Sequence, residues 1–276
     1  MLKISQIFIY PIKSLGGINL QQAEVSDRGF KYDRRWMVVD SNGRFLTQRE
    51  FLVMALLKVS LAKDGLLVTY SVDGSNILIP FEPIKKDIIE VVVWDDTCKG
   101  QLVSDEVDTW FTQKLNMDCR LVYMPDDSHR PTDERYTYNG QITSFSDGYP
   151  FMMIGQASLD DLNGRMTQPL GIERFRPNIV FTGGDAFEED LIDEFTINDI
   201  NFNGVKLCAR CVMTTIDQQT AEKGKDPLKT LASYRLKNNK IYFGQNVVHS
   251  GTGFIAVGDE LTVLSIHTEE RFIIPS

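Results

Sequence analysis

Residues 36–47 read WMVVDSNGRFLT, a segment that strongly predicts its own local structure. Two apolar runs flank the dipeptide Asn42-Gly43, whose residues readily adopt the positive φ angles of a tight hairpin turn. Val, Trp and Phe favour extended backbone because their side chains pack well on a pleated surface. The segment therefore predicts an antiparallel hairpin and, with it, a fold built from β-strands.

Short apolar runs of the same kind continue on both sides of this hairpin. Turn dipeptides such as Gly16-Gly17, Asp64-Gly65 and Asp73-Gly74 separate them. Many short strands with Gly-rich turns favour an antiparallel barrel or sandwich over a doubly wound sheet. No Gly-rich phosphate loop of the nucleotide-binding type follows any run. Strands are expected at residues 2–10, 36–39, 57–62, 66–70, 77–80, 88–93, 178–182, 195–200, 212–216, 261–264 and 272–274.

Helices are predicted to be few and short. Apolar residues recur on one face of residues 105–116 and of residues 157–166. A third helix is expected after Asp226-Pro227, where an N-cap residue precedes proline at the first helical position. The polar stretch 125–141 has no periodicity, so it is either a linker or a functional lid.

The predicted fold class is mostly β with short helices, in two domains. We place the boundary near residue 120, which gives an N-terminal β-barrel-like domain at residues 1–120 and a C-terminal β-barrel domain at residues 121–276.

Composition and charge exclude several classes of protein. The chain has 276 residues, of which 42% are hydrophobic and 24% charged, as in soluble globular proteins rather than disordered or collagen-like ones. The net charge of −9 argues against binding a nucleic acid polymer or an anionic membrane surface through broad charge neutralisation. Any anion that the protein binds therefore needs a local cluster of Lys and Arg.

Cysteine usage and the N-terminus bear on location. The chain contains four cysteines, too few and too scattered for a secreted disulfide scaffold. The N-terminal residues alternate like a strand rather than forming a signal peptide, and no run approaches the ~18 apolar residues of a membrane span. We expect a cytoplasmic protein with reduced thiols.

The motif Cys208-Ala209-Arg210-Cys211 allows several interpretations. A zinc site usually needs a second close pair of ligands, and the sequence offers only scattered cysteines and three isolated histidines. A thioredoxin-type dithiol precedes a helix, whereas the residues after Cys211 predict a strand. Both cysteines could also be buried structural residues. A thiolate beside the Arg210 guanidinium is stabilised, however, and can bind a soft or borderline metal.

Four further motifs place charged or hydrogen-bonding residues beside strand ends or proline turns. An anion pocket needs such groups, although each motif alone also fits a solvated turn. They are Tyr10-Pro11-Ile12-Lys13-Ser14, Asp33-Arg34-Arg35-Trp36, Ser146-Asp147-Gly148-Tyr149-Pro150 and Arg174-Phe175-Arg176-Pro177-Asn178.

Together these motifs resemble the MOSC-domain family, in the subgroup that carries an N-terminal β-barrel half. The subgroup includes the mitochondrial amidoxime-reducing components and their bacterial relatives. The match runs in order through YPIKS, DRRW, LTQR, SDGYPF, RFRPNIVF, CARCVMTTID and DPLKTLASYR, from about residue 3 to about residue 265.

The resemblance implies a molybdenum cofactor, with the metal held by two dithiolene sulfurs of a pterin, terminal oxygens and one cysteine. That ligand corresponds to Cys211, and Arg210 belongs to its surroundings. Asp147, Gly148 and Tyr149 are implied near the metal, and Asp147 is a candidate proton relay. The implied pterin and phosphate contacts are Lys13, Ser14, Arg34, Arg176 and Asn178.

The implied activity is reduction of N-hydroxylated substrates such as amidoximes, hydroxylamines or N-hydroxylated base analogues. Four cysteines, two of them in one motif, cannot supply a further Cys₄ iron–sulfur cluster. We therefore expect a separate ferredoxin- or flavoprotein-type electron donor. A sulfur-transfer protein with a persulfide on Cys211 and a non-catalytic cofactor carrier stay open. Pyridoxal phosphate on Lys13 is a weaker alternative.

Overall fold

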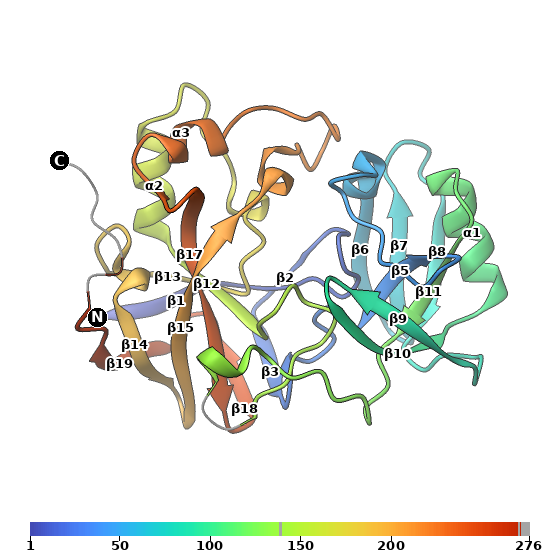
Figure 1. The fold of residues 1–276 in the computed structure, drawn as a ribbon, viewed down its shortest axis with the longest axis horizontal. Coiled ribbons are helices and arrows are strands. Elements are labelled where there is room, and N and C mark those ends of the chain that lie inside the picture. The colour runs from blue at the N-terminus through green and yellow to red at the C-terminus, as the bar shows by residue number, and fades with distance from the viewer. Residues whose placement is uncertain (138–139, 270, 272–276) are drawn as a thin grey trace.

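The computed structural model describes residues 1–137, 140–269 and 271. The chain forms two lobes that meet along a central junction (Figure 1). Its elements are mostly strands with a few short helices, which confirms the predicted fold class. Among the described residues, no helix is long and apolar enough to cross a membrane.

The larger lobe contains a closed seven-stranded barrel. The sheet runs in the order β12-β13-β1-β19-β14-β15-β17, and β12 also pairs with β17, which closes the ring. Two short strands, β2 (Ile18–Leu20) and β16 (Leu236–Lys237), pair with β1 and β17. The barrel strands are β1 (Leu2–Ile9), β12 (Phe151–Gly155), β13 (Ile179–Thr182), β14 (Ile192–Ile197), β15 (Ile200–Arg210), β17 (Lys240–Ser250) and β19 (Glu260–Ile266).

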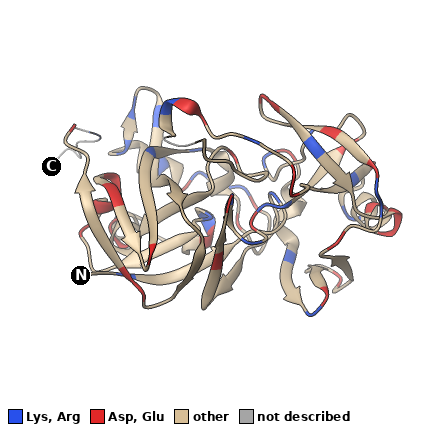
Figure 2. Ribbon diagram, turned by 90° about the horizontal axis from the view of Figure 1, so that it is seen from below, with Lys and Arg blue, Asp and Glu red and all other residues tan. Residues whose placement is uncertain are grey.

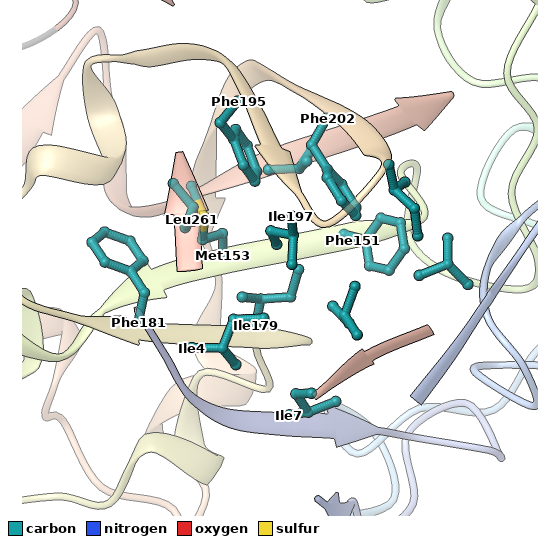
Figure 3. Packing of buried hydrophobic residues seen from close by; sticks show 14 of the residues in the cluster. Ile4, Ile7, Phe151, Met153, Ile179, Phe181, Phe195, Ile197, Phe202 and Leu261 are labelled. Carbon is teal, nitrogen blue, oxygen red and sulfur yellow. The ribbon is translucent and has the colours of Figure 1, made fainter. Parts of the chain in front are cut away.

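Alternating apolar side chains from distant strands fill this barrel. Ile7 of β1 pairs in register with Ile179 of β13, and Phe195 of β14 pairs with Phe202 of β15. Figure 3 shows these side chains directed toward one another. All four are fully buried, so the barrel interior is a packed core rather than a ligand channel.

The barrel includes the first strand of the chain, so its pairing crosses the boundary that we place near residue 120. β1 is nearly 180 residues from β13 along the chain, and apolar side chains on both drive their pairing. A small sheet of β3 (Gln22–Ser26), β4 (Gly29–Phe30) and β18 (Gly253–Ala256) also joins the two ends of the chain. The division into domains 1–120 and 121–276 stays a prediction.

The smaller lobe contains two antiparallel sheets around a second core. One runs in the order β5-β11-β10-β9 and the other β6-β7-β8. Helix α1 (Asp105–Leu115) packs Val107, Phe111 and Leu115 into this core. The strands are β5 (Trp36–Asp40), β6 (Leu57–Ala62), β7 (Gly65–Tyr70), β8 (Asn76–Pro80), β9 (Ile88–Val93), β10 (Asp96–Leu102) and β11 (Cys119–Tyr123).

The hairpin predicted at residues 36–47 is confirmed. Val39 bridges Phe45 in antiparallel fashion, and the amide of Leu46 donates to the carbonyl of Val38 at 2.8 Å. Gly43 has a φ of +78°, as the turn requires. The turn matters for function because it leads the chain from β5 into the loop that contains Arg49.

The predicted helices form with small shifts of their ends. Helix α2 spans Gln156–Gly164, and α3 spans Leu228–Ala232 directly after Pro227. Asp226 accepts a hydrogen bond from the amide of Thr230 at 3.1 Å. The short 3₁₀ helices are η1 (Leu52–Leu56), η2 (Glu134–Tyr136), η3 (Ile172–Arg174), η4 (Glu188–Asp190) and η5 (Val212–Thr215).

The strand predicted at residues 212–216 is wrong. Thr214 donates to the carbonyl of Cys211 at 3.0 Å, and Thr215 donates to that of Val212 at 2.7 Å. These local bonds stabilise the η5 turn against the strand preference of β-branched residues. The strand predicted at residues 272–274 lies outside the described residues.

Candidate functional site

A cavity of about 330 Å³ lies where the two lobes meet, and every predicted site residue lines it. Figure 2 shows Lys and Arg residues in blue among the loops between the lobes. The lining includes Lys13, Ser14, Arg34, Asp147, Gly148, Tyr149, Arg176, Asn178, Arg210 and Cys211. Five separate segments of the chain contribute these residues, so the site exists only in the folded molecule.

Most of the predicted residues lie beside the ends of barrel strands, whereas Arg34 precedes β5 of the smaller lobe. Lys13 and Ser14 follow β1, and the loop containing Asp147 precedes β12. Arg176 precedes β13, and Cys211 follows β15. Strand ends are held firmly by the sheet, whereas the loops beyond them are free to present polar groups. The barrel therefore positions the site at its edge, facing the smaller lobe.

Two partly buried arginines flank the same aromatic ring. The guanidinium carbons of Arg34 and Arg176 lie 4.3 and 4.2 Å from the ring centroid of Tyr10. Arg34 pairs with Asp33 at 2.6 Å, whereas Arg176 donates to the carbonyl of Leu15 at 2.7 Å. Burial lowers the pKa of Arg176 to about 10. An anion bound here would offset both the burial and the repulsion between the two guanidinium groups.

The backbone at these positions is strained. Ser14, Arg34 and Arg176 have φ angles of +67°, +49° and +57°, in the left-handed region that L-residues with a side chain rarely adopt. Such conformations cost about 1–3 kcal/mol each and cluster at binding sites. This strain is a physical reason to treat the three residues as functional rather than as ordinary turn residues.

Asn178 connects the arginines to the barrel. Its Oδ1 accepts from Nη1 of Arg34 at 3.0 Å and from the amide of Met152 at 3.2 Å. Its Nδ2 donates to the carbonyl of Phe8 at 3.2 Å. The side chain is buried, so its described contacts orient Arg34 and tie β1 to the strands β12 and β13.

Lys13 and Asp147 form an ion pair across the junction. Nζ of Lys13 lies 2.6 Å from Oδ1 of Asp147 and donates to the carbonyl of Phe145 at 2.8 Å. Burial lowers the pKa of Lys13 to about 8. Desolvation alone would raise the pKa of Asp147, but the charge and hydrogen bond of Lys13, with the charge of Arg49, hold it well below its usual range. Asp147 is therefore a carboxylate in this arrangement.

The low pKa of Lys13 predicts a pH dependence of anion binding. The amine is charged below about pH 8 and neutral above it. Affinity for inorganic phosphate should therefore be highest below pH 8 and then fall by up to about tenfold per pH unit. Calorimetric titration of the cofactor-free protein between pH 7 and pH 9.5 measures this. Lys13→Arg should flatten the profile, whereas a flat profile in the unmodified protein would exclude Lys13 as an anion contact.

The thiols lie at the end of β15. Nε of Arg49 lies 3.3 Å from Sγ of Cys211, and Nη1 of Arg210 lies 3.0 Å from Sγ of Cys208. Both cysteines are free and half-buried. No group of three or more His, Cys, Asp or Glu side chains gathers as a metal site in the described part of the chain. Protein ligands alone therefore do not form a chelating cluster around Cys211.

The polar stretch 125–141, predicted as a linker or a lid, contributes Arg130 to the loop that contains Asp147. Arg130 is buried, and its Nη1 donates to the carbonyls of Ser144 and Ser146 at 2.8 and 2.7 Å. Arg130 also pairs with Asp96 of β10 at 2.8 Å. The segment thus holds the loop containing Asp147 against the smaller lobe.

Sequence reasoning missed the lining residues of the smaller lobe, of which Arg49 and Trp94 contact other site residues most directly. Arg49 belongs to the LTQR motif, which carries the family resemblance, so the motif itself offered a signal. Trp94 lies at the turn between β9 and β10, and nothing local marks it as a site residue. Only the docking of that hairpin against the loop of Asp147 reveals it.

The residues that line the cavity fit an anionic cofactor that contains a metal ion. Six lining residues are basic (Lys13, Arg34, Arg49, Arg174, Arg176 and Arg210), and one, Asp147, is acidic. Asp33 and Asp217 pair with Arg34 and Arg174 from outside the lining, which leaves the cavity basic. Nε of Arg210 is buried without a hydrogen-bond partner among the described residues. Cys211 adds a thiol at the same cavity.

Comparison with known proteins shows the family. Residues 1–118 match the MOSC N-terminal beta barrel domain, and residues 140–262 match the MOSC domain. The chain therefore belongs to the MOSC family, in the group with an N-terminal MOSC β-barrel domain, as the sequence motifs predicted.

Its relatives include proteins named for amidoxime reduction. The mouse mitochondrial amidoxime-reducing component 1 is 31% identical over 95% of this chain and 82% of its own length. The rat mitochondrial amidoxime reducing component 2 is 34% identical over 93% of this chain and 81% of its length. The human mitochondrial amidoxime-reducing component 1 is 33% identical, with 95% and 82% covered.

Proposed function

We propose that this chain is a molybdenum-cofactor-dependent reductase of N-hydroxylated compounds such as amidoximes, hydroxylamines and N-hydroxylated base analogues. One observation carries the proposal: residues from both lobes form a basic cavity that two free cysteines, Cys208 and Cys211, also line. The relatives named for amidoxime reduction support the reaction class. When bound, the cofactor would supply a metal that exchanges electron pairs and accepts an oxygen atom.

Different residues of the chain would contact the metal and the terminal phosphate of this cofactor. Cys211 is the metal ligand among them, and Arg49 lies against its sulfur. Lys13, Arg34 and Arg176 supply positive charge for a terminal phosphate, which carries about −1.5 to −2 charges at neutral pH. Ser14 and Asn178 are neutral groups of the same cradle.

Reduction of an N–OH group consumes two electrons and two protons and releases water. We propose that the electrons come from a separate ferredoxin- or flavoprotein-type donor. The purified protein with a small-molecule reductant alone should therefore turn over more slowly than with the best protein donor. Equal rates would contradict the need for a donor protein.

Asp147 is our candidate for proton delivery. Its carboxylate is ionised and carries no proton of its own at neutral pH, so Lys13 or water would supply the proton and Asp147 would accept it and pass it to the departing hydroxyl group. Asp147→Asn should lower kcat for amidoxime reduction by about 100-fold, the lower range of general acid–base catalysis, while metal content stays near that of the unmodified protein. Steady-state kinetics with metal analysis measures both, and a retained rate would exclude the relay.

The proposal as a whole is tested on protein from a host that makes molybdenum cofactor. We expect near-stoichiometric molybdenum and reduction of benzamidoxime to benzamidine with a chemical reductant. A protein without molybdenum that instead releases sulfur to cyanide would be a persulfide carrier. Bound cofactor that transfers readily to an acceptor enzyme, with no turnover of N-hydroxylated compounds, would identify a carrier.

A further inference from the structure

Trp94 occupies the tip of the hairpin that the smaller lobe extends toward the barrel. Strands β9 and β10 are joined by two residues, Trp94 and Asp95, because Val93 pairs directly with Asp96. The indole lines the same cavity as Cys211. Nε1 of Trp94 donates to Oδ1 of Asp147 at 3.1 Å, so the hairpin tip contacts the barrel domain at its site loop.

A tryptophan is energetically unfavourable at this position of the turn, because the backbone there has a positive φ angle. Trp94 has a φ of +59°, whereas Asp95 does not have a positive φ. A two-residue hairpin turn with positive φ at its first position is usually made with glycine, because a side chain there is strained. Trp94 is also 44% exposed, so it contributes little to a core. Neither turn formation nor core packing accounts for a large aromatic residue here.

The indole is nevertheless held in one orientation. The ring of Phe45 packs against it edge to face, with centroids 5.0 Å apart. The guanidinium carbon of Arg49 lies 4.5 Å from the indole centroid. With the hydrogen bond to Asp147, three contacts fix the ring. A rigid, partly exposed aromatic side chain in a cavity is a typical element of ligand binding.

Arg49 links the indole to the thiol. Its Nε lies 3.3 Å from Sγ of Cys211, while the same guanidinium group stacks on Trp94. The indole is therefore separated from the proposed metal ligand by one guanidinium group. A substrate whose reacting N–OH group lies near Cys211 would place the rest of its structure beside Trp94.

We propose that Trp94 determines specificity by stacking on the planar aromatic part of N-hydroxylated substrates, so that aromatic compounds are preferred over small ones. This inference rests on the proposed function. Stacking of a ring on an indole is favourable whatever the polar substituents, because every aromatic ring has a π-face. A compound without a ring, such as hydroxylamine, would gain nothing from Trp94.

The competing explanation is that Trp94 is only a structural latch, whose hydrogen bond to Asp147 holds the hairpin tip against the barrel domain. Two variants separate the explanations. Trp94→Ala removes both the ring and the N–H donor, whereas Trp94→Phe keeps a ring and loses only the donor. Phe254→Ala is the matched control, because Phe254 is 57% exposed and does not line the cavity.

The experiment measures kcat and KM for benzamidoxime and hydroxylamine, and the Kd of benzamidoxime for the oxidised holoenzyme by calorimetry. In Trp94→Ala we expect KM and Kd for benzamidoxime to rise about five- to 150-fold, the range of single stacking contacts. The KM for hydroxylamine should stay within about twofold. Trp94→Phe should remain close to the unmodified protein, and Phe254→Ala should match it.

Three results would overturn the inference. These are unchanged benzamidoxime binding in Trp94→Ala, equal effects on both substrates, or a Trp94→Phe variant as impaired as Trp94→Ala. The last two would identify a latch. If neither compound is reduced but the Kd of benzamidoxime still depends on the ring at position 94, the proposed function fails while the aromatic binding surface stands.

Discussion

Cys211→Ala is expected to abolish the reduction of N-hydroxylated compounds and to remove most of the bound molybdenum. Cys211 is the thiol that lies against Arg49 in the cavity, whereas the second lining thiol, Cys208, contacts Arg210 instead. Changes to residues that merely orient metal ligands cost about 10–100-fold in affinity or activity. Loss of the protein ligand itself should therefore cost at least about 100-fold in kcat/KM.

The measurement combines elemental analysis with benzamidoxime kinetics. Cys98→Ala is the matched control, because Cys98 is also a free, half-buried cysteine but does not line the cavity. Full molybdenum content and activity in Cys211→Ala would contradict the proposed ligand. Retained molybdenum with lost activity would show instead that the basic residues dominate cofactor binding while Cys211 serves the reaction.

The second large effect is expected for Arg176→Met. Methionine keeps the length of the buried stem and removes the charge that faces the cavity. A hydrogen bond to a charged group is worth about 1.5–3 kcal/mol, which corresponds to a loss of affinity of about 10- to 150-fold. The cofactor should therefore dissociate during purification, and molybdenum content should fall with it, although Cys211 is intact.

Arg165→Met is a closely matched control for this change. The guanidinium carbon of Arg165 lies 4.2 Å from the ring centroid of Tyr234, the same separation as between Arg176 and Tyr10. Arg165 pairs with Asp161 on the surface of α2 and does not line the cavity. Full molybdenum content in Arg176→Met after gel filtration would show that Arg176 does not hold the cofactor. An equal loss in both variants would indicate general destabilisation.

The site also explains why the chain tolerates unfavourable local structure. Ser14, Arg34, Trp94 and Arg176 all have positive φ angles and all line the cavity. Folding has to compensate for this strain elsewhere, and the packed barrel core provides a rigid frame for doing so.

The amino-acid sequence by itself determined the fold class, and it proposed the members of the candidate site. Alternating apolar residues and turn dipeptides are local signals, so the hairpin around Asn42-Gly43 and helix α1 were predictable. The ten candidate site residues came from the resemblance of short motifs to the MOSC family, and their roles at the site stay predictions. Their convergence on one cavity agrees with the resemblance that singled them out.

Only the tertiary structure decided how distant segments meet. It placed β1 in the C-terminal barrel, replaced the strand predicted at residues 212–216 with the η5 turn, and brought Arg49 and Trp94 to Cys211. The physical reason is that strand pairing and domain docking depend on surfaces formed by residues far apart in the chain. The local preference of a residue for strand or helix does not encode those contacts. At η5, the hydrogen bonds of the Thr214 and Thr215 hydroxyls outweighed the preference of these residues for a strand.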